Sequence, residues 1–115
     1  MELEITNRPW GTYEVLLDTE YCKVKRIMVQ PDSKLSYQYH LHRRECWTVV
    51  KGMLTIVLDG EKIFRKEGQS VRIPLGAKHR AWNESSEPTI FIEVQTGTYF
   101  GEDDIIRIED DYGRI

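Results

Sequence analysis

The sequence predicts an all-β fold, either a sandwich or a barrel, and two observations support this prediction. Short runs of β-branched and aromatic residues recur along the chain at intervals of about ten residues. Turn-forming Gly, Pro and Asp residues separate these runs. Between the turns, the apolar residues lack the spacing of an amphipathic helix. We therefore expect a chain built of strands alone.

The individual strands follow from the alternating runs. They are predicted at residues 12–17, 22–29, 36–41, 46–50, 54–58, 62–65, 70–73, 79–82 and 90–95. Asp59 and Gly60 lie between two of these runs and favour the positive φ angles of a type I′ turn, so the flanking strands should form a hairpin. The acidic segment 101–115 is only weakly periodic, and we expect a short strand or a turn of helix there.

Composition limits the class of protein. A chain of 115 residues, 40% hydrophobic and 30% charged, suits one domain with one core. No apolar run approaches the roughly 20 residues of a membrane span, and residues 1–4 lack the basic and apolar blocks of a signal peptide. We expect a soluble, cytoplasmic protein.

The charge and the cysteines exclude other classes. The net charge of −3 argues against nucleic acid as a partner, although a local basic pocket could still bind the phosphate of a small molecule. Cys22 and Cys46 match no paired metal or redox spacing, and we expect both to be reduced thiols.

Potential metal ligands are concentrated between Tyr37 and Trp47. Residues two apart in a strand share a face, so Gln38 and His40, with His42 next in the series, should point into the same space. A further histidine, His79, follows the rigid turn formed by residues 74–76. Neutral imidazoles, a carboxylate and an amide oxygen together suit a divalent first-row ion.

The spacing of these residues resembles the two motifs of the cupin superfamily. The second motif is complete as Gly68, Pro74, Gly76, His79 and Asn83. The first motif is matched by Gln38, His40, Glu45 and Gly52, with Gln in place of the first histidine. The resemblance implies a single cupin domain over residues 1–115, a double-stranded β-helix or jelly-roll barrel. Its motif-bearing core would span about 8–100, followed by the acidic segment 101–115.

The cupin resemblance also implies a ligand set and a cofactor. The predicted ligands are Gln38, His40, Glu45 and His79, and they would bind one divalent ion, zinc first, with cobalt, nickel or manganese as alternatives. His42 is closer to Glu45 than the motif allows, so we assign it to the pocket as a substrate contact, with ligation as the lesser alternative. Cys46 should face away from the ligands and pack as an inert thiol.

Segments near both ends of the chain resemble one cupin group, the type II mannose-6-phosphate isomerase domain. The matching segments are residues 8–11, 23–26, 93–97, 101–105 and 111–114. This domain is usually the C-terminal part of a bifunctional isomerase and mannose-1-phosphate guanylyltransferase. Where the family commonly has His-His-His-Arg-Ala-Glu-His-Trp, this chain has Leu41, Arg44 and Cys46 at the second, fifth and seventh of these positions.

The family resemblance implies interconversion of mannose 6-phosphate and fructose 6-phosphate through an enediol. The ligands would hold a metal that stabilises the developing charge. His42 and Glu93 are the candidate catalytic acid and base groups. The candidate phosphate-binding cations are Arg8, Arg43, Lys78 and Arg80. The tryptophans are assigned mainly to packing.

Two alternatives stay open from the sequence. The first is a metal-dependent sugar-binding cupin without turnover. The second is another cupin enzyme, such as an oxygenase or a sugar epimerase. The expected partners are a small sugar phosphate and a second copy of the chain, bound through outer strands, with neither nucleic acid nor membrane. The sequence leaves open whether a separate guanylyltransferase works alongside this chain, and the resemblance implies no nucleotide chemistry for it.

Overall fold

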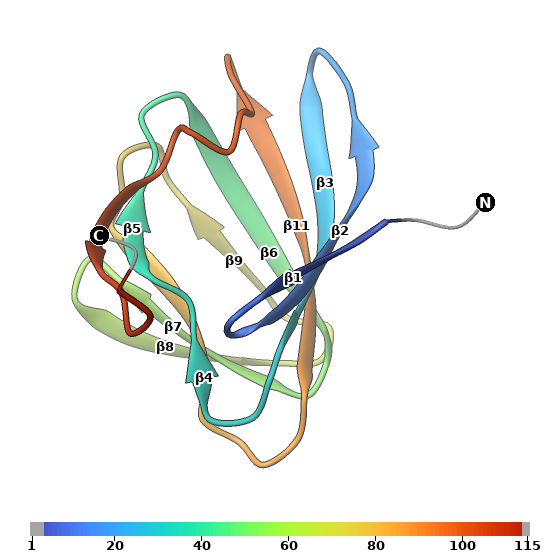
Figure 1. Ribbon diagram of the computed structural model, residues 1–115, viewed down its shortest axis with the longest axis vertical. Helices are drawn as coiled ribbons and strands as arrows, with labels where there is room; N and C mark the ends of the chain where they lie inside the picture. Colours follow the sequence, from blue (N-terminus) through green and yellow to red (C-terminus); the bar gives the residue numbers. More distant parts are fainter. Residues whose placement is uncertain (1–3, 114–115) are drawn as a thin grey trace.

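Two antiparallel β-sheets packed face to face make up the computed structural model, which describes residues 4–113 (Figure 1). The first sheet has the order β1 (Ile5–Arg8), β2 (Gly11–Asp18), β3 (Cys22–Val29), β11 (Thr89–Gly97), β6 (Arg43–Lys51) and β9 (Ser70–Ile73). The second has the order β12 (Ile106–Glu109), β5 (Tyr37–Tyr39), β10 (His79–Asn83), β7 (Met53–Leu58) and β8 (Glu61–Lys66), with β4 (Ser33–Lys34) paired to β10. The all-β prediction is confirmed, since residues 4–113 form no helix.

Some predictions concern the chain ends. The prediction that the chain starts without a signal peptide depends partly on residues 1–3, and the last segment that resembles the family includes Arg114. Residues 1–3 and Arg114 lie outside the described residues. Nothing between residues 4 and 113 forms a helix long and apolar enough to cross a membrane.

Most predicted strands are present, and the differences have physical causes. The strands at 22–29 and 70–73 have the predicted bounds. The strand predicted at 36–41 is present but shorter: β5 spans only Tyr37–Tyr39, and the chain bends at residues 41–42. Strand β6 begins three residues before the predicted strand at 46–50, because its first inward side chains, Arg43 and Glu45, are charged and give no apolar signal.

The predicted turn at Asp59 and Gly60 is confirmed. Both residues have positive φ, 46° and 86°, as a type I′ turn requires. The turn joins β7 and β8 in a hairpin in which Leu58 pairs with Glu61. The segment after residue 101 forms a short strand, β12, which pairs with β5.

The inner face of the first sheet is divided into an apolar half and a polar half. Along β3, β11 and β6, alternate residues are buried, as strand geometry requires. The buried residues of the apolar half are Ile27, Val29, Trp47, Val49 and Phe91. Those of the polar half are Lys23, Lys25, Arg43, Glu45, Glu93 and Gln95. The apolar half packs as the core, and the polar half provides one wall of the site.

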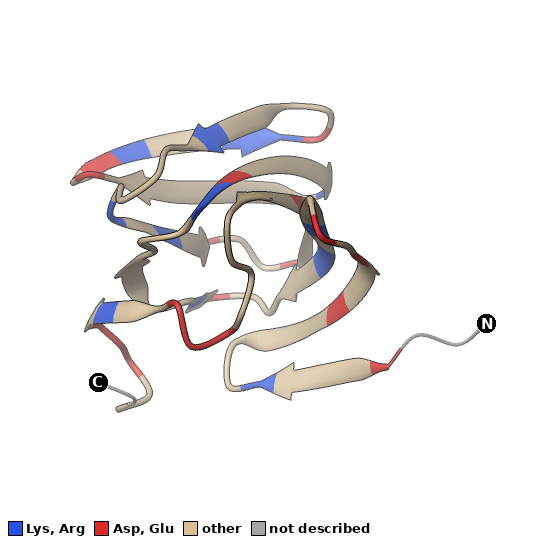
Figure 2. Ribbon diagram, turned by 90° about the horizontal axis from the view of Figure 1, so that it is seen from above, with Lys and Arg blue, Asp and Glu red and all other residues tan. Residues whose placement is uncertain are grey.

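Over the molecule as a whole, basic and acidic residues are mixed and spread out, in contrast to their concentration in the polar half of the interior. In the view of Figure 2, basic and acidic segments are interspersed around the barrel, and neither sign covers a whole side. The concentration of charge in the polar half of the interior is therefore a local feature.

Candidate metal centre

Three of the four predicted ligands meet inside the barrel. One ligand atom from each of His40, Glu45 and His79 lies within 4.8 Å of the other two. His40 follows the end of β5, Glu45 lies on β6, and His79 begins β10. All three residues are buried. The fold thus brings together side chains from both sheets that are up to 39 positions apart in the sequence.

In both histidines, Nδ1 makes a hydrogen bond, so Nε2 is the ring nitrogen that can bind a metal ion. His40 Nδ1 donates to the carbonyl oxygen of Asp104 at 2.6 Å, and His79 Nδ1 donates to that of Ala77 at 2.8 Å. Each Nε2 then carries the lone pair and faces Glu45, at 3.1 Å and 3.6 Å respectively. Among the described residues, the buried Nε2 of His79 has no hydrogen-bond partner. This donor set fits a divalent cation.

Gln38, the fourth predicted ligand, lies beside this cluster. It is the register partner of His79 across β5 and β10, so the two side chains share a face of the sheet. Its Oε1 accepts a hydrogen bond from Ser36 Oγ at 2.5 Å. Gln38 also lines the adjoining cavity. Its role as a ligand stays a prediction.

The electrostatics of the cluster favour bound charge. Burial opposes ionisation of Glu45, but its contacts with His40 and His79 hold its pKa well below the usual range. Burial also opposes protonation of His79, yet its contact with Glu45 raises the pKa of that imidazole. A negative carboxylate between two imidazoles is the arrangement that a metal cation would complete.

A polar cavity of about 150 Å³ adjoins the metal cluster. Four cationic side chains line it, from Arg8, Lys25, Arg43 and Arg107, together with the carboxylates of Glu93 and Glu102. The cavity therefore combines excess positive charge with two groups that can accept hydrogen bonds. Such a lining suits a polar anion.

Glu93 is a buried acid in this cavity with an altered pKa. Burial raises the pKa of Glu93 to about 7, and the charge of Glu45 adds to the rise. Trp47 Nε1 lies 3.1 Å from both Glu93 Oε2 and Glu45 Oε1 and donates between them. Sequence reasoning assigned Trp47 to packing and missed this contact, since spacing along β6 does not reveal a partner on β11.

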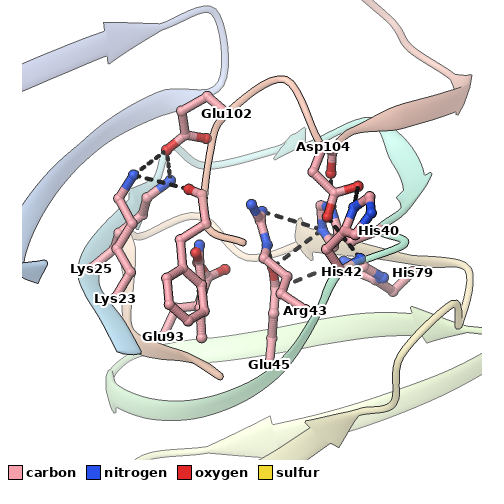
Figure 3. Close-up of polar contacts among 12 residues, drawn as sticks. Lys23, Lys25, His40, His42, Arg43, Glu45, His79, Glu93, Glu102 and Asp104 are labelled. Atoms are coloured by element: carbon pink, nitrogen blue, oxygen red, sulfur yellow. Dashed lines mark hydrogen bonds and ion pairs between the residues drawn. The ribbon is translucent and has the colours of Figure 1, made fainter. Parts of the chain in front are cut away.

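Arg8 and Arg43, two of the predicted phosphate-binding residues, line the cavity; Figure 3 shows Arg43 between Glu93 and the histidines. Arg43 is buried, and its Nε donates to Glu45 Oε2 at 2.9 Å. Its Nη2 lies 3.4 Å from His40 Nε2. Arg43 therefore contacts the proposed ligands as well as the cavity.

Three other predicted site residues do not line this cavity. The side chain of His42 is 54% exposed and contacts Asp104 and Tyr99, because the strand ends before it and the alternation stops. Lys78 is exposed in the loop immediately before β10. Arg80 follows His79 on β10 and so points to the opposite face, where it donates to Leu35 O and pairs with Glu109.

The C-terminal segment supplies contacts that sequence reasoning did not assign. The carboxylate of Asp104 accepts the backbone N–H groups of Leu41 and His42, both at 3.0 Å. Glu102, in the same segment, bonds Lys23 and Lys25 (Figure 3). The only sequence signal was the family-like run at 101–105, in a segment expected to form a short strand or a turn of helix packed against the barrel.

The two sheets and the buried His and Glu cluster define the cupin class of β-barrel proteins. A Klebsiella pneumoniae protein with a double-stranded β-helix domain is similar at a TM-score of 0.73 and 26% identity, covering 84% of this chain and 77% of that one. An RmlC-like cupin from Shewanella frigidimarina gives 0.75 at 19% identity, covering 89% and 88%. The second likeness concerns the fold alone.

Within the cupin class, the chain belongs to the family described as "Mannose-6-phosphate isomerase C-terminal", whose model matches residues 2–110. The xanthan biosynthesis protein XanB of Xanthomonas campestris is 48% identical over 93% of this chain and 23% of that protein. The mannose-1-phosphate guanylyltransferase ManC of Salmonella typhimurium is 45% identical over 94% and 22%. The alginate biosynthesis protein AlgA of Pseudomonas aeruginosa is 45% identical over 93% and 22%. The chain thus spans less than a quarter of these relatives.

These names correct the predicted activity. The sequence-based prediction was interconversion of mannose 6-phosphate and fructose 6-phosphate. Relatives that are 43–45% identical are named mannose-1-phosphate guanylyltransferase instead. The isomerase prediction was wrong because it carried the activity of a family description over to this chain, whereas the related proteins are named for guanylyl transfer or for polysaccharide biosynthesis.

Proposed function

We propose that this chain is a metal-dependent cupin domain that works together with a mannose-1-phosphate guanylyltransferase. It would bind a phosphorylated mannose in its interior cavity. The observation that carries the proposal is the pair of buried imidazoles, His40 and His79, whose Nε2 atoms converge on Glu45 beside a cavity rich in cationic side chains. The names of the relatives supply the class of sugar.

The metal part of the proposal rests on the donor set. His40, Glu45 and His79 would hold the ion, with Gln38 as the fourth protein ligand. A divalent ion bound there would polarise the oxygen atoms of a sugar in the cavity. Zinc is the first candidate, because two imidazoles and one carboxylate are ordinary zinc ligands, with cobalt, nickel and manganese as alternatives.

The other cavity residues would orient the sugar. Arg8 and Arg43 supply donors for the hydroxyl and phosphate oxygens. Glu93, whose pKa is about 7, can accept a hydrogen bond from a sugar hydroxyl or hold a proton near neutral pH. Trp10, which lines the same cavity, offers an apolar wall for the sugar ring.

Calorimetry tests the proposal directly. Protein treated with chelator is reloaded with zinc, cobalt, nickel or manganese, and mannose 1-phosphate, mannose 6-phosphate and mannose are titrated into each form. We expect one metal ion per chain and tighter binding of a mannose phosphate by the loaded protein.

The matched variants are His79→Ala and His42→Ala. His79→Ala should lose both metal and sugar phosphate binding, while His42→Ala, which removes an exposed histidine outside the cavity, should keep both. The proposal is contradicted if both variants lose binding equally, or if sugar phosphate binds equally well with and without the metal.

The proposal also concerns the oligomeric state of the protein and its place in the cell. We expect a homodimer formed through outer strands, because exposed strand edges favour pairing, and a cytoplasmic site of action beside a guanylyltransferase. Sedimentation analysis tests the first expectation. In a strain that encodes this chain, disrupting its metal cluster should lower the pool of GDP-mannose.

A further inference from the structure

Two buried lysines share one carboxylate at the edge of the cavity. Lys23 and Lys25 lie two residues apart on β3, so both side chains point inward. Glu102 Oε1 accepts from Lys23 Nζ at 3.2 Å and from Lys25 Nζ. The lysine side chains are 10% and 7% exposed, whereas that of Glu102 is 41% exposed. The cations are therefore fixed in the barrel, and the anion is at its opening.

The charge at this corner is not balanced. Two ammonium groups face one carboxylate, and Arg8 lines the same cavity, with Glu93 as the other acid; Arg43 is already paired with Glu45. This local excess occurs in a chain whose net charge is −3. Buried cations are costly without an anion of matching charge, so the corner favours a ligand that brings more negative charge than one carboxylate does.

We propose that Lys23 and Lys25 form the phosphoryl subsite of the cavity, and that the Glu102 carboxylate is an internal counter-ion which the phosphate of the ligand displaces. The inference rests on the proposed function in one respect, because that function supplies the phosphorylated sugar. A phosphate monoester brings up to two negative charges and three acceptor oxygens, so it satisfies both ammonium groups better than the single oxygen of Glu102.

The C-terminal segment allows this exchange. Figure 3 shows Glu102 beside Lys23 and Lys25, and Asp104 above the turn that holds His40 and His42. Asp104 is held by two backbone N–H groups and is 8% exposed, so it stays in place when Glu102 leaves. The movement is confined to the side chain of Glu102 and its immediate backbone. The lowered pKa of Glu102, set by Lys25 against the opposing effect of burial, keeps it a charged competitor.

The test measures binding of inorganic phosphate and mannose 1-phosphate by calorimetry at constant ionic strength. Glu102→Gln removes the competitor and should bind inorganic phosphate about tenfold tighter, a difference of about 1.4 kcal/mol. Lys25→Met should bind it about tenfold weaker. Glu61→Gln, an equal charge change at an exposed residue of β8, should leave the affinity unchanged and is the matched control.

A second pair of variants tests the subsite without depending on whether Lys25→Met folds. Lys23→Met combined with Glu102→Gln leaves one lysine and no carboxylate, and it should bind phosphate about tenfold tighter than Lys23→Met alone. Phosphate affinity in Glu102→Gln that equals that of Glu61→Gln overturns the inference, as does wild-type affinity in Lys25→Met.

The outcomes separate this inference from the proposed function. If His79→Ala abolishes mannose 1-phosphate binding while Glu102→Gln changes no phosphate affinity, the proposed function stands and the subsite is wrong. If Glu102→Gln tightens binding of inorganic phosphate but no mannose phosphate binds to the metal-loaded protein, the subsite stands and the proposed function is wrong.

Discussion

Asp104 holds the turn that carries the candidate ligand His40, although it lies in a distant part of the chain. Its carboxylate accepts two backbone N–H groups, and its carbonyl accepts the Nδ1 proton of His40. Burial opposes ionisation of Asp104, but hydrogen bonds from the N–H groups of Leu41 and His42 lower its pKa below the usual value. Asp104 therefore orients a proposed ligand without touching the metal position itself.

Replacing Asp104 should weaken metal binding. Asp104→Asn keeps one acceptor oxygen but loses the charge that both N–H groups contact, so we expect about 10-fold weaker metal affinity. Competition with a chromogenic chelator measures the affinity. Asp103→Asn, the adjacent exposed residue, is the control and should match the wild type. Equal affinities in all three proteins would contradict the positioning role.

Glu93 should make stability depend on pH. Its pKa in the folded protein is about 7, against 4.5 for an ordinary glutamate, so the folded protein retains a proton that the unfolded chain has lost. The stability it contributes is present below pH 4.5 and is lost as pH rises to about 7.

Urea denaturation in chelator tests this dependence. Between pH 4.5 and pH 8, the unfolding free energy of the wild type should fall relative to that of Glu93→Gln by roughly 2–4 kcal/mol. Parallel pH profiles for the two proteins would show that Glu93 titrates normally.

At the scale of elements, the close approach of β11 to the turn at His42 and Arg43 depends on Gly97. This residue ends β11 with φ of 150°, and a Cβ there would lie 2.2 Å from His42 O and 2.8 Å from Arg43 Cα. Since both neighbours are backbone atoms, the strand end or the turn would have to move. The absence of a side chain therefore helps to fix the position of β6 at its first residues.

Gly97→Ala should destabilise the protein more than a matched glycine substitution. Gly68 also has a positive φ, 84°, but a Cβ added there would meet no atom within 4 Å, so Gly68→Ala should cost about 1–2 kcal/mol from backbone strain alone. For Gly97→Ala we expect a loss of more than about 3 kcal/mol, because the backbone clash adds to the strain. Urea denaturation compares the two, and equal losses would remove the packing argument.

At the scale of the whole molecule, the barrel encloses a carboxylate and two imidazoles that a cation would stabilise. Glu45, His40 and His79 are all buried between the two sheets. Because the ligands come from β5, β6 and β10, a bound ion would connect both sheets, and unfolding would have to release it.

Metal should therefore stabilise the fold. At a free metal concentration of 100 times the dissociation constant, binding adds about 2.7 kcal/mol to the unfolding free energy, which should raise Tm by roughly 10 °C. Thermal denaturation with and without chelator measures the shift. His79→Ala should show almost none, and a shift of equal size in that variant would place the ion elsewhere.

The sequence by itself determined the β-rich fold and the residues that meet at the centre. Alternation and turn residues are local properties, so the strand at residues 22–29 and the hairpin at Asp59 and Gly60 followed directly. The spacing of His40, Glu45 and His79 matched a known motif, and the structure brings these residues together.

Only the tertiary structure decided which polar residues face the cavity. The period of a strand says which residues share a face, but it does not say whether that face is inside or outside. That Lys25 faces the cavity, and that Arg80 is buried on the face opposite to His79, therefore needed the packed sheets. Glu102 and Asp104 contact residues more than 60 positions earlier, and such long-range contacts have no local signal in the chain.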